Sequence, residues 1–146
     1  MRKTNAKQWK TVSDVMTPQP VALTLDQTAA EAARVMRDSD IGDVLVTESG
    51  ELRGIVTDRD LVVRCIADGR NPEMTTLDEI CSKTLITLTP DSPLHEAITM
   101  MRAQTVRRLP VVDGKVPIGI VSIGDLARGL DRESVTGRIS AAPPNR

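Results

Sequence analysis

Residues 54–61, GIVTDRDL, recur 65 positions later as residues 119–126, GIVSIGDL. The correspondence continues without a gap over Val15 to Leu61 and Ile80 to Leu126. A repeat of this kind indicates two copies of one supersecondary unit in the chain. We therefore expect a single module with internal pseudo-twofold symmetry and two related crevices.

The composition limits the classes of partner. The chain has 146 residues, about the size of one domain, so two half-units are expected to share one core. Its 19 basic and 20 acidic residues give no broad positive surface for a nucleic-acid backbone. One tryptophan without tyrosine or phenylalanine provides no platform for stacking single-stranded bases. We expect no nucleic-acid partner and a core of aliphatic side chains.

The cysteines and the hydropathy bear on the compartment. Cys65 and Cys81 are isolated and form no pair motif, which favours a reducing compartment over a disulfide framework. No apolar run approaches the roughly 18 residues of a membrane span, and residues 1–9 lack the apolar stretch of a secretory signal. The expectation is a cytoplasmic protein that does not enter a membrane.

The pattern of apolar and turn residues predicts the order β-α-β-β-α in each copy, and hence an α/β (α+β) fold of tandem repeats. In the first copy the predicted strands are 21–25, 44–47 and 53–57, and the predicted helices are 29–38 and 61–67. In the second copy the strands are 86–89, 109–112 and 117–122, and the helices are 94–103 and 124–128. Turns are predicted at residues 48–50 and 113–114. The β-α-β crossover should make the first two strands of each copy parallel.

The composition also predicts domain boundaries. The predicted segments are a flexible tail at 1–12, a first domain at 13–69, a linker at 70–78, a second domain at 79–130 and a flexible tail at 131–146. Trp9 either lies in the solvated tail or docks on a neighbouring subunit.

Each copy ends its last strand with a hydroxyl residue followed three positions later by aspartate: Thr57 and Asp60, then Ser122 and Asp125. One interpretation is a helix capping box, which needs no ligand. The other is a ligand site, because a strand that runs directly into a helix presents backbone N–H groups to an anion. The hydroxyl could then reach a phosphate, and the aspartate could accept hydrogen bonds from ribose hydroxyls. This second interpretation favours a nucleotide.

The two copies differ in the charge of the residues beside these motifs. Hairpin pairing should place Arg107 and Arg108 beside Ser122 and Asp125, and guanidinium groups are well shaped for phosphate. The alternative is a solvated charged pair at a strand end. The first copy has Gly42 and Asp43 at these positions, in an acidic neighbourhood. The apolar residues available to flank a purine, or otherwise to pack in the core, are Val21, Ile41, Ile86 and Val106.

The sequence offers little for catalysis. His95 is the only histidine and lies at the start of a predicted helix. No His and Cys cluster has the spacing of a metal site, and a single histidine limits every triad-like scheme. We therefore predict no enzyme, no catalytic residue and no metal site.

The set of motifs resembles a pair of cystathionine-β-synthase (CBS) domains, a Bateman module. The resemblance rests on the duplicated β-α-β-β-α unit, the opening Met16-Thr17-Pro18, the strand RRLPVVD at 107–113 and the two Gly-x-x-Thr/Ser-x-x-Asp endings. It covers about residues 13–128. Stand-alone modules of this length are similar to bacterial CBS-pair proteins, including those of the hypoxic-response type.

This resemblance implies a disc-like homodimer that binds AMP, ADP, ATP or S-adenosylmethionine, needs no obligatory cofactor and modulates an unknown regulated protein. Carried over by position, the nucleotide-binding residues are Pro20, Val21, Ile41, Gly42, Arg107, Arg108, Ser122, Gly124 and Asp125. A second, weaker cleft would use Thr57, Arg59, Asp60, Ile86 and Val106. The first copy lacks the basic pair and the proline of Leu109-Pro110-Val111, which weakens the case for nucleotide in that cleft.

Two other functions stay open from the sequence. The chain could be a ligand-free protein-interaction module in which the two cleft motifs are only helix caps. It could also be an enzyme that uses a cleft-bound metal, although no metal-ligand motif supports this.

Overall fold

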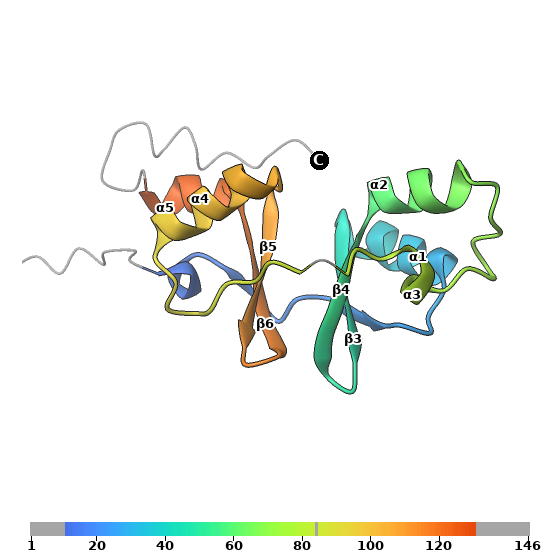
Figure 1. The fold of residues 1–146 in the computed structure, drawn as a ribbon, viewed down its shortest axis with the longest axis horizontal. Coiled ribbons are helices and arrows are strands. Elements are labelled where there is room, and N and C mark those ends of the chain that lie inside the picture. The colour runs from blue at the N-terminus through green and yellow to red at the C-terminus, as the bar shows by residue number, and fades with distance from the viewer. Residues whose placement is uncertain (1–10, 84, 131–146) are drawn as a thin grey trace, which may run out of the picture. The chain divides into compact units, whose positions relative to one another are not determined.

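The computed structural model describes residues 11–83 and 85–130, which form two compact units (Figure 1). Within the described residues, unit 1 contains 11–18, 87–113 and 118–130, and unit 2 contains 19–83, 85–86 and 114–117. Trp9 and most of the two predicted tails lie outside the described residues. Thr11 and Val12 belong to unit 1, where Val12 is fully buried.

Unit 2 contains the first copy of the repeat. Its elements are β2 (Ala22–Thr24), α1 (Ala29–Ser39), β3 (Asp43–Glu48), β4 (Glu51–Thr57), α2 (Asp58–Asp60), the π-helical η2 (Leu61–Ile66) and α3 (Leu77–Ile80). The sheet order is β2-β3-β4, with β2 parallel to β3 and β3 antiparallel to β4. The predicted β-α-β-β-α order and the parallel first pair are therefore confirmed in this copy.

Unit 1 contains the second copy. Its elements are η1 (Val12–Asp14), β1 (Thr17–Pro18), α4 (Leu94–Gln104), β5 (Arg108–Asp113), β6 (Val116–Ser122) and α5 (Ile123–Leu130), except that the first two residues of β6 are assigned to unit 2. The sheet order is β1-β6-β5. The predicted helices and the hairpin of this copy are present.

The predicted strand at 86–89 is wrong in its extent. Only Leu88 pairs in parallel with Val111, through bonds from Leu88 N to Pro110 O at 2.9 Å and from Val112 N to Leu88 O at 2.8 Å. The next N–H, on Thr89, donates to Ser92 Oγ at 3.0 Å. The next residue of this segment that would face β5 is Pro90, which has no N–H to donate, so the ladder ends after one residue.

Both hairpin turns fall where the sequence predicts them. Ser49 and Gly50 have φ of 53° and 79° between β3 and β4, and Gly114 has φ of 63° between β5 and β6. Two-residue hairpin loops require such positive φ values. The pairs Ser49-Gly50 and Asp113-Gly114 therefore mark the hairpin turns in the sequence.

The two units exchange the segments that precede each copy. In unit 1, Thr17 pairs with Ile120 of β6. In unit 2, the equivalent Ser82 pairs with Ile55 of β4. Each unit thus joins the body of one copy to the leading segment of the other. The compact units therefore divide the chain differently from the predicted domains 13–69 and 79–130, which follow the sequence repeat.

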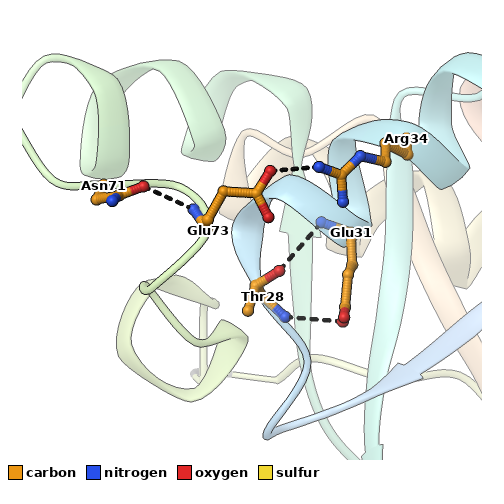
Figure 2. Close-up of polar contacts among 5 residues, drawn as sticks. All are labelled: Thr28, Glu31, Arg34, Asn71 and Glu73. Carbon is orange, nitrogen blue, oxygen red and sulfur yellow. Dashed lines mark hydrogen bonds and ion pairs between the residues drawn. The ribbon is translucent and has the colours of Figure 1, made fainter.

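The predicted linker packs on α1 within unit 2. Helix α1 begins with a capping box, in which Glu31 N donates to Thr28 Oγ1 at 3.2 Å and Thr28 N donates to Glu31 Oε2 at 3.1 Å (Figure 2). Arg34 of α1 forms an ion pair with Glu73 of the following segment (Figure 2). Asn71 Oδ1 accepts a bond from Glu73 N at 3.0 Å in the same segment.

This packing changes which face of α1 is buried. Ala29, Ala30, Ala32 and Met36 are buried, whereas Ala33 is exposed. The reason is that the segment after η2 covers the start of the helix, where Ala30 N donates to Pro72 O at 3.0 Å.

The predicted aliphatic core is confirmed. In unit 2 its members include Val44, Val46, Val56, Leu77 and Ile80. In unit 1 the fully buried large side chains include Leu88, Val111, Val121 and Leu126. Burying each such side chain contributes about 1.5–3 kcal/mol, so these aliphatic residues stabilise the fold without tyrosine or phenylalanine.

A glycine allows the exchanged segment to approach each sheet. A Cβ added to Gly54 would lie 2.7 Å from Cys81 Sγ and 3.0 Å from the backbone oxygen of Ser82. At the equivalent Gly119, an added Cβ would lie 2.4 Å from Met16 Sδ. Glycine stands at the same position of both copies because a larger residue would crowd the segment packed against each sheet.

We predict that Gly54→Ala lowers the free energy of unfolding by about 1–3 kcal/mol, because the methyl group must displace backbone as well as the Cys81 side chain. Urea unfolding followed by circular dichroism measures this change. Gly124→Ala is the control, since its Cβ would have only ordinary contacts, the nearest at 3.7 Å. Equal midpoints for wild type and Gly54→Ala would contradict the close approach.

The two thiols are free and buried, and burial raises the pKa of Cys81. A raised pKa in the folded state means that its contribution to stability is complete below the unfolded thiol pKa of about 8.5 and is lost as pH rises from there through the folded pKa. We therefore expect the urea midpoint to fall above about pH 8.5. Cys81→Ala should show a smaller alkaline decline, and an identical decline would assign the effect to other groups.

Candidate functional site

Each copy turns from its last strand into a helix at a corner that contains the predicted site residues. We call Arg107, Arg108, Ser122, Gly124 and Asp125 the α5 corner. The α2 corner, in unit 2, consists of Gly42, Asp43, Thr57, Arg59 and Asp60.

The α5 corner contains a complete capping box. Asp125 N donates to Ser122 Oγ at 3.1 Å, and Ser122 N donates to Asp125 Oδ2 at 2.8 Å. Asp125 is only 8% exposed. Its other carboxylate oxygen, Oδ1, pairs with the guanidinium of Arg128 one turn further along α5. The capping interpretation of the motif is therefore confirmed, and the buried carboxylate is paired with a cation, as its burial requires.

The hairpin brings the two arginines to this corner, as predicted. Ile123 N donates to the backbone oxygen of Arg107 at 2.9 Å, and Arg108 begins β5. Both arginines are exposed. The α5 corner therefore combines a hydroxyl, a helix start and exposed positive charge, a combination that suits a phosphorylated ligand.

The α2 corner has the same backbone geometry and the opposite charge. Asp60 N donates to Thr57 Oγ1 at 3.1 Å, Thr57 N donates to Asp60 Oδ2 at 2.9 Å, and Asp58 N donates to Gly42 O at 2.9 Å. The position of an added Gly42 Cβ is 3.3 Å from Asp58 Oδ2. A carboxylate therefore faces the position that corresponds to Arg107, and it opposes the binding of a phosphate there.

Arg64 partly balances this acidic corner. Its Nε is 3.8 Å from Asp60 Oδ1, while its Nη1 donates to Ile80 O at 3.1 Å. Because the second contact anchors the guanidinium to the backbone of α3, Arg64 is held against the protein. Arg59, by contrast, is exposed.

The remaining predicted residues belong to different units. Pro20, Val21, Ile41 and Gly42 belong to unit 2, where Val21 is 38% exposed and Ile41 N donates to Met36 O at 3.0 Å. Ile86 belongs to unit 2 and Val106 to unit 1. The role of these residues toward a ligand stays a prediction.

Sequence reasoning missed Arg128. Its signal was available, because an acidic and a basic residue three positions apart on a helix face each other. The pair was overlooked because the corner was interpreted only up to Asp125. Arg128 adds a cation to the α5 corner and pairs with one oxygen of the aspartate that the sequence analysis expects to accept hydrogen bonds from ribose hydroxyls.

Other site classes find little support in the described residues. Across 11–83 and 85–130, no group of three or more His, Cys, Asp and Glu side chains is arranged to hold a metal ion. Within the same ranges, no helix has the length and apolar character needed to cross a membrane. His95 lies exposed in the first turn of α4.

The family model of the CBS domain matches the chain twice, over residues 12–66 and 77–132. The chain therefore belongs to the CBS-domain family and carries two copies of the domain. It is 40% identical over 116 residues to the CBS domain-containing protein YhcV of Bacillus subtilis, covering 80% of this chain and 82% of that protein.

Two solved structures are similar to the chain. One is Hypoxic Response Protein I with two coordinated zinc ions, at a TM-score of 0.75 and 30% identity, covering 81% of this chain and 97% of that one. The other is the CBS domain pair of protein MJ0100 in complex with 5′-methylthioadenosine and S-adenosyl-L-methionine, at a TM-score of 0.75 and 25% identity, covering 85% and 98%. The predicted fold is thereby confirmed.

We predict that Asp125→Ala destabilises the protein by about 1–2 kcal/mol, because it removes a helix cap and leaves Arg128 without its partner. Asp60→Ala should cost less, since Asp60 is more exposed and its ion pair is longer. Urea unfolding of both variants measures the difference. A larger loss for Asp60→Ala would contradict the assignment of the tighter cap to the α5 corner.

Proposed function

We propose that this CBS-domain pair is a non-enzymatic regulatory protein that binds an adenine nucleotide at the α5 corner and thereby modulates a partner protein. The observation that carries the proposal is the position of two exposed arginines at the hydroxyl-bearing start of α5. The corresponding positions in the first copy are Gly42 and Asp43, so the arginine pair is specific to the second copy.

The chemistry of a phosphate supports the α5 corner. Ile123 N donates to the backbone oxygen of Arg107, so this contact with the corner does not use the guanidinium. Hydrogen bonds from a guanidinium to a phosphate contribute about 1.5–3 kcal/mol each. The Ser122 hydroxyl accepts from Asp125 N and still has its own proton to donate to a phosphate oxygen.

The adenosine part of the proposal draws on the family. A structural relative is a complex with 5′-methylthioadenosine and S-adenosyl-L-methionine, which supports an adenosine-containing ligand here. AMP, ADP, ATP and S-adenosylmethionine are the ligands to compare.

The second, weaker site involves Thr57, Arg59, Asp60, Ile86 and Val106. Asp58 beside Gly42 makes a phosphate unfavourable there, so we propose that this site has a lower affinity for nucleotides than the α5 corner. Its charge is better matched to a ligand without phosphate groups.

We further propose that the protein acts as a homodimer in the cytoplasm. On η2 the side chains of Val62, Val63 and Ile66 are 58%, 43% and 58% exposed, an apolar stripe that a second copy would cover. A nucleotide that binds one conformation of the dimer better by 1–3 kcal/mol would be sufficient to signal to a regulated protein.

One observation favours a second function, a ligand-free interaction module. Both hydroxyl and aspartate pairs are complete reciprocal caps, so the motif has a structural role in each copy without any ligand. This alternative accounts for the motif at the acidic corner, but it does not account for the exposed guanidinium of Arg107 at the α5 corner.

Isothermal titration of the purified protein with AMP, ADP, ATP and S-adenosylmethionine tests the proposal. We expect binding of at least one of them below millimolar concentration, and a roughly tenfold loss of nucleotide affinity in Arg107→Gln because one charged phosphate contact is removed. Arg102→Gln, at the end of α4, is the matched control that removes the same charge elsewhere in unit 1.

The stability of these variants separates the two functions. Arg107→Gln should unfold at the same urea concentration as the wild type, since its side chain is exposed. Absence of heat with all four compounds up to millimolar concentration would reject nucleotide binding and leave the interaction module.

A further inference from the structure

The α5 corner contains an internal cation bound to its key carboxylate. Arg128 pairs with Asp125 Oδ1, while Asp125 Oδ2 accepts the bond from Ser122 N at 2.8 Å. Both carboxylate oxygens are therefore engaged before any ligand arrives. Only one of these engagements, the cap, is required to start the helix.

The two members of the ion pair differ in their exposure. The Asp125 side chain is 11% exposed, whereas the Arg128 side chain is 39% exposed. An arginine with this exposure can change partner without unfolding the helix, because water solvates its charge during the exchange. The carboxylate, held by the cap, stays in place.

The guanidinium lies close to the proposed phosphate position. A Cβ built on Gly124 would be 3.7 Å from Ser122 Oγ and 3.8 Å from Arg128 Nη1, so these two atoms flank the same point. Gly124 has no side chain to separate them. A small movement of Arg128 would bring its guanidinium to an anion held by the Ser122 hydroxyl.

The first copy has no equivalent of this arrangement. The residue 65 positions before Arg128 is Val63, which is 43% exposed. Asp60 of the first copy pairs instead with Arg64, whose guanidinium is also bound to Ile80 O. The movable cation is thus a property of the α5 corner.

We propose that Arg128 is the charge-selecting residue of this site. It leaves Asp125 Oδ1 for the phosphate of a bound nucleotide, and the freed oxygen accepts a hydrogen bond from a ribose hydroxyl. This inference rests on the proposed nucleotide site. It predicts selection for phosphorylated ligands over adenosine, because adenosine offers no new partner to the displaced guanidinium.

Titration calorimetry with adenosine, AMP and ATP at one pH and salt concentration tests this residue. Arg128→Gln should weaken AMP and ATP about tenfold or more, as expected from loss of one charged phosphate contact, while leaving adenosine unchanged or slightly tighter. Arg128→Lys keeps the charge and should retain part of the preference for AMP. The control is Arg37→Gln, which breaks an exposed Arg–Asp pair in unit 2.

The outcomes separate this inference from the proposed function. If the wild type binds AMP and Arg128→Gln weakens AMP and adenosine equally, or neither, the charge-selecting role is overturned and the nucleotide site stands. If the wild type binds neither AMP nor ATP, the charge-selecting role is overturned, and the titrations with ADP and S-adenosylmethionine decide whether the proposed function stands. If Arg128→Gln strongly lowers the urea midpoint, the AMP and adenosine affinities of Arg128→Lys are compared with those of the wild type. An unchanged preference for AMP supports a role of the charge, and a complete loss of the preference overturns it.

Discussion

The reciprocal hydrogen bonds between a hydroxyl residue and the aspartate three positions later are the interaction on which both halves depend. At Ser122 and Asp125, as at Thr57 and Asp60, they end a strand and begin a helix within one residue. The cap satisfies N–H groups that would otherwise lack partners at the helix start. It also fixes the direction in which the hydroxyl and carboxylate point, so the fold itself builds the polar corner.

The same atoms therefore serve the fold and the proposed ligand, and the motif alone cannot distinguish the two roles. The residues around the motif do distinguish them. At the α2 corner the carboxylate of Asp58 lies beside Gly42. At the α5 corner the position equivalent to Gly42 is Arg107. A phosphate is repelled in the first case and attracted in the second. Duplication supplied one scaffold twice, and the difference in charge makes one copy suitable for an anionic ligand.

The sequence predicted most of the local structure because the two copies have the same pattern of apolar and turn residues at equivalent positions. The hairpin turns at Ser49-Gly50 and at Gly114 need positive φ, which leaves a clear mark in the sequence. The exchanged leading segments were not predictable, because Thr17 and Ser82 pair with residues that lie far away in sequence. The strand at Leu88 is shorter than predicted because Pro90, the next residue that would face β5, has no N–H to donate. In the site, hairpin geometry predicted the position of Arg107. The contact of Arg128 with Asp125 follows from their spacing of three residues on one face of α5.

Arg128 also explains how a buried carboxylate can serve a ligand at all. An aspartate as enclosed as Asp125 needs a cation or a set of donors in the empty state, since an isolated charge at low exposure is costly. The cap supplies one donor and Arg128 supplies the charge. When a ribose hydroxyl replaces the guanidinium, the carboxylate loses its cation and gains a neutral donor, which is unfavourable unless positive charge stays nearby. A phosphate that retains Arg128 at the corner would meet this condition, so the proposed site couples recognition of the phosphate to recognition of the ribose.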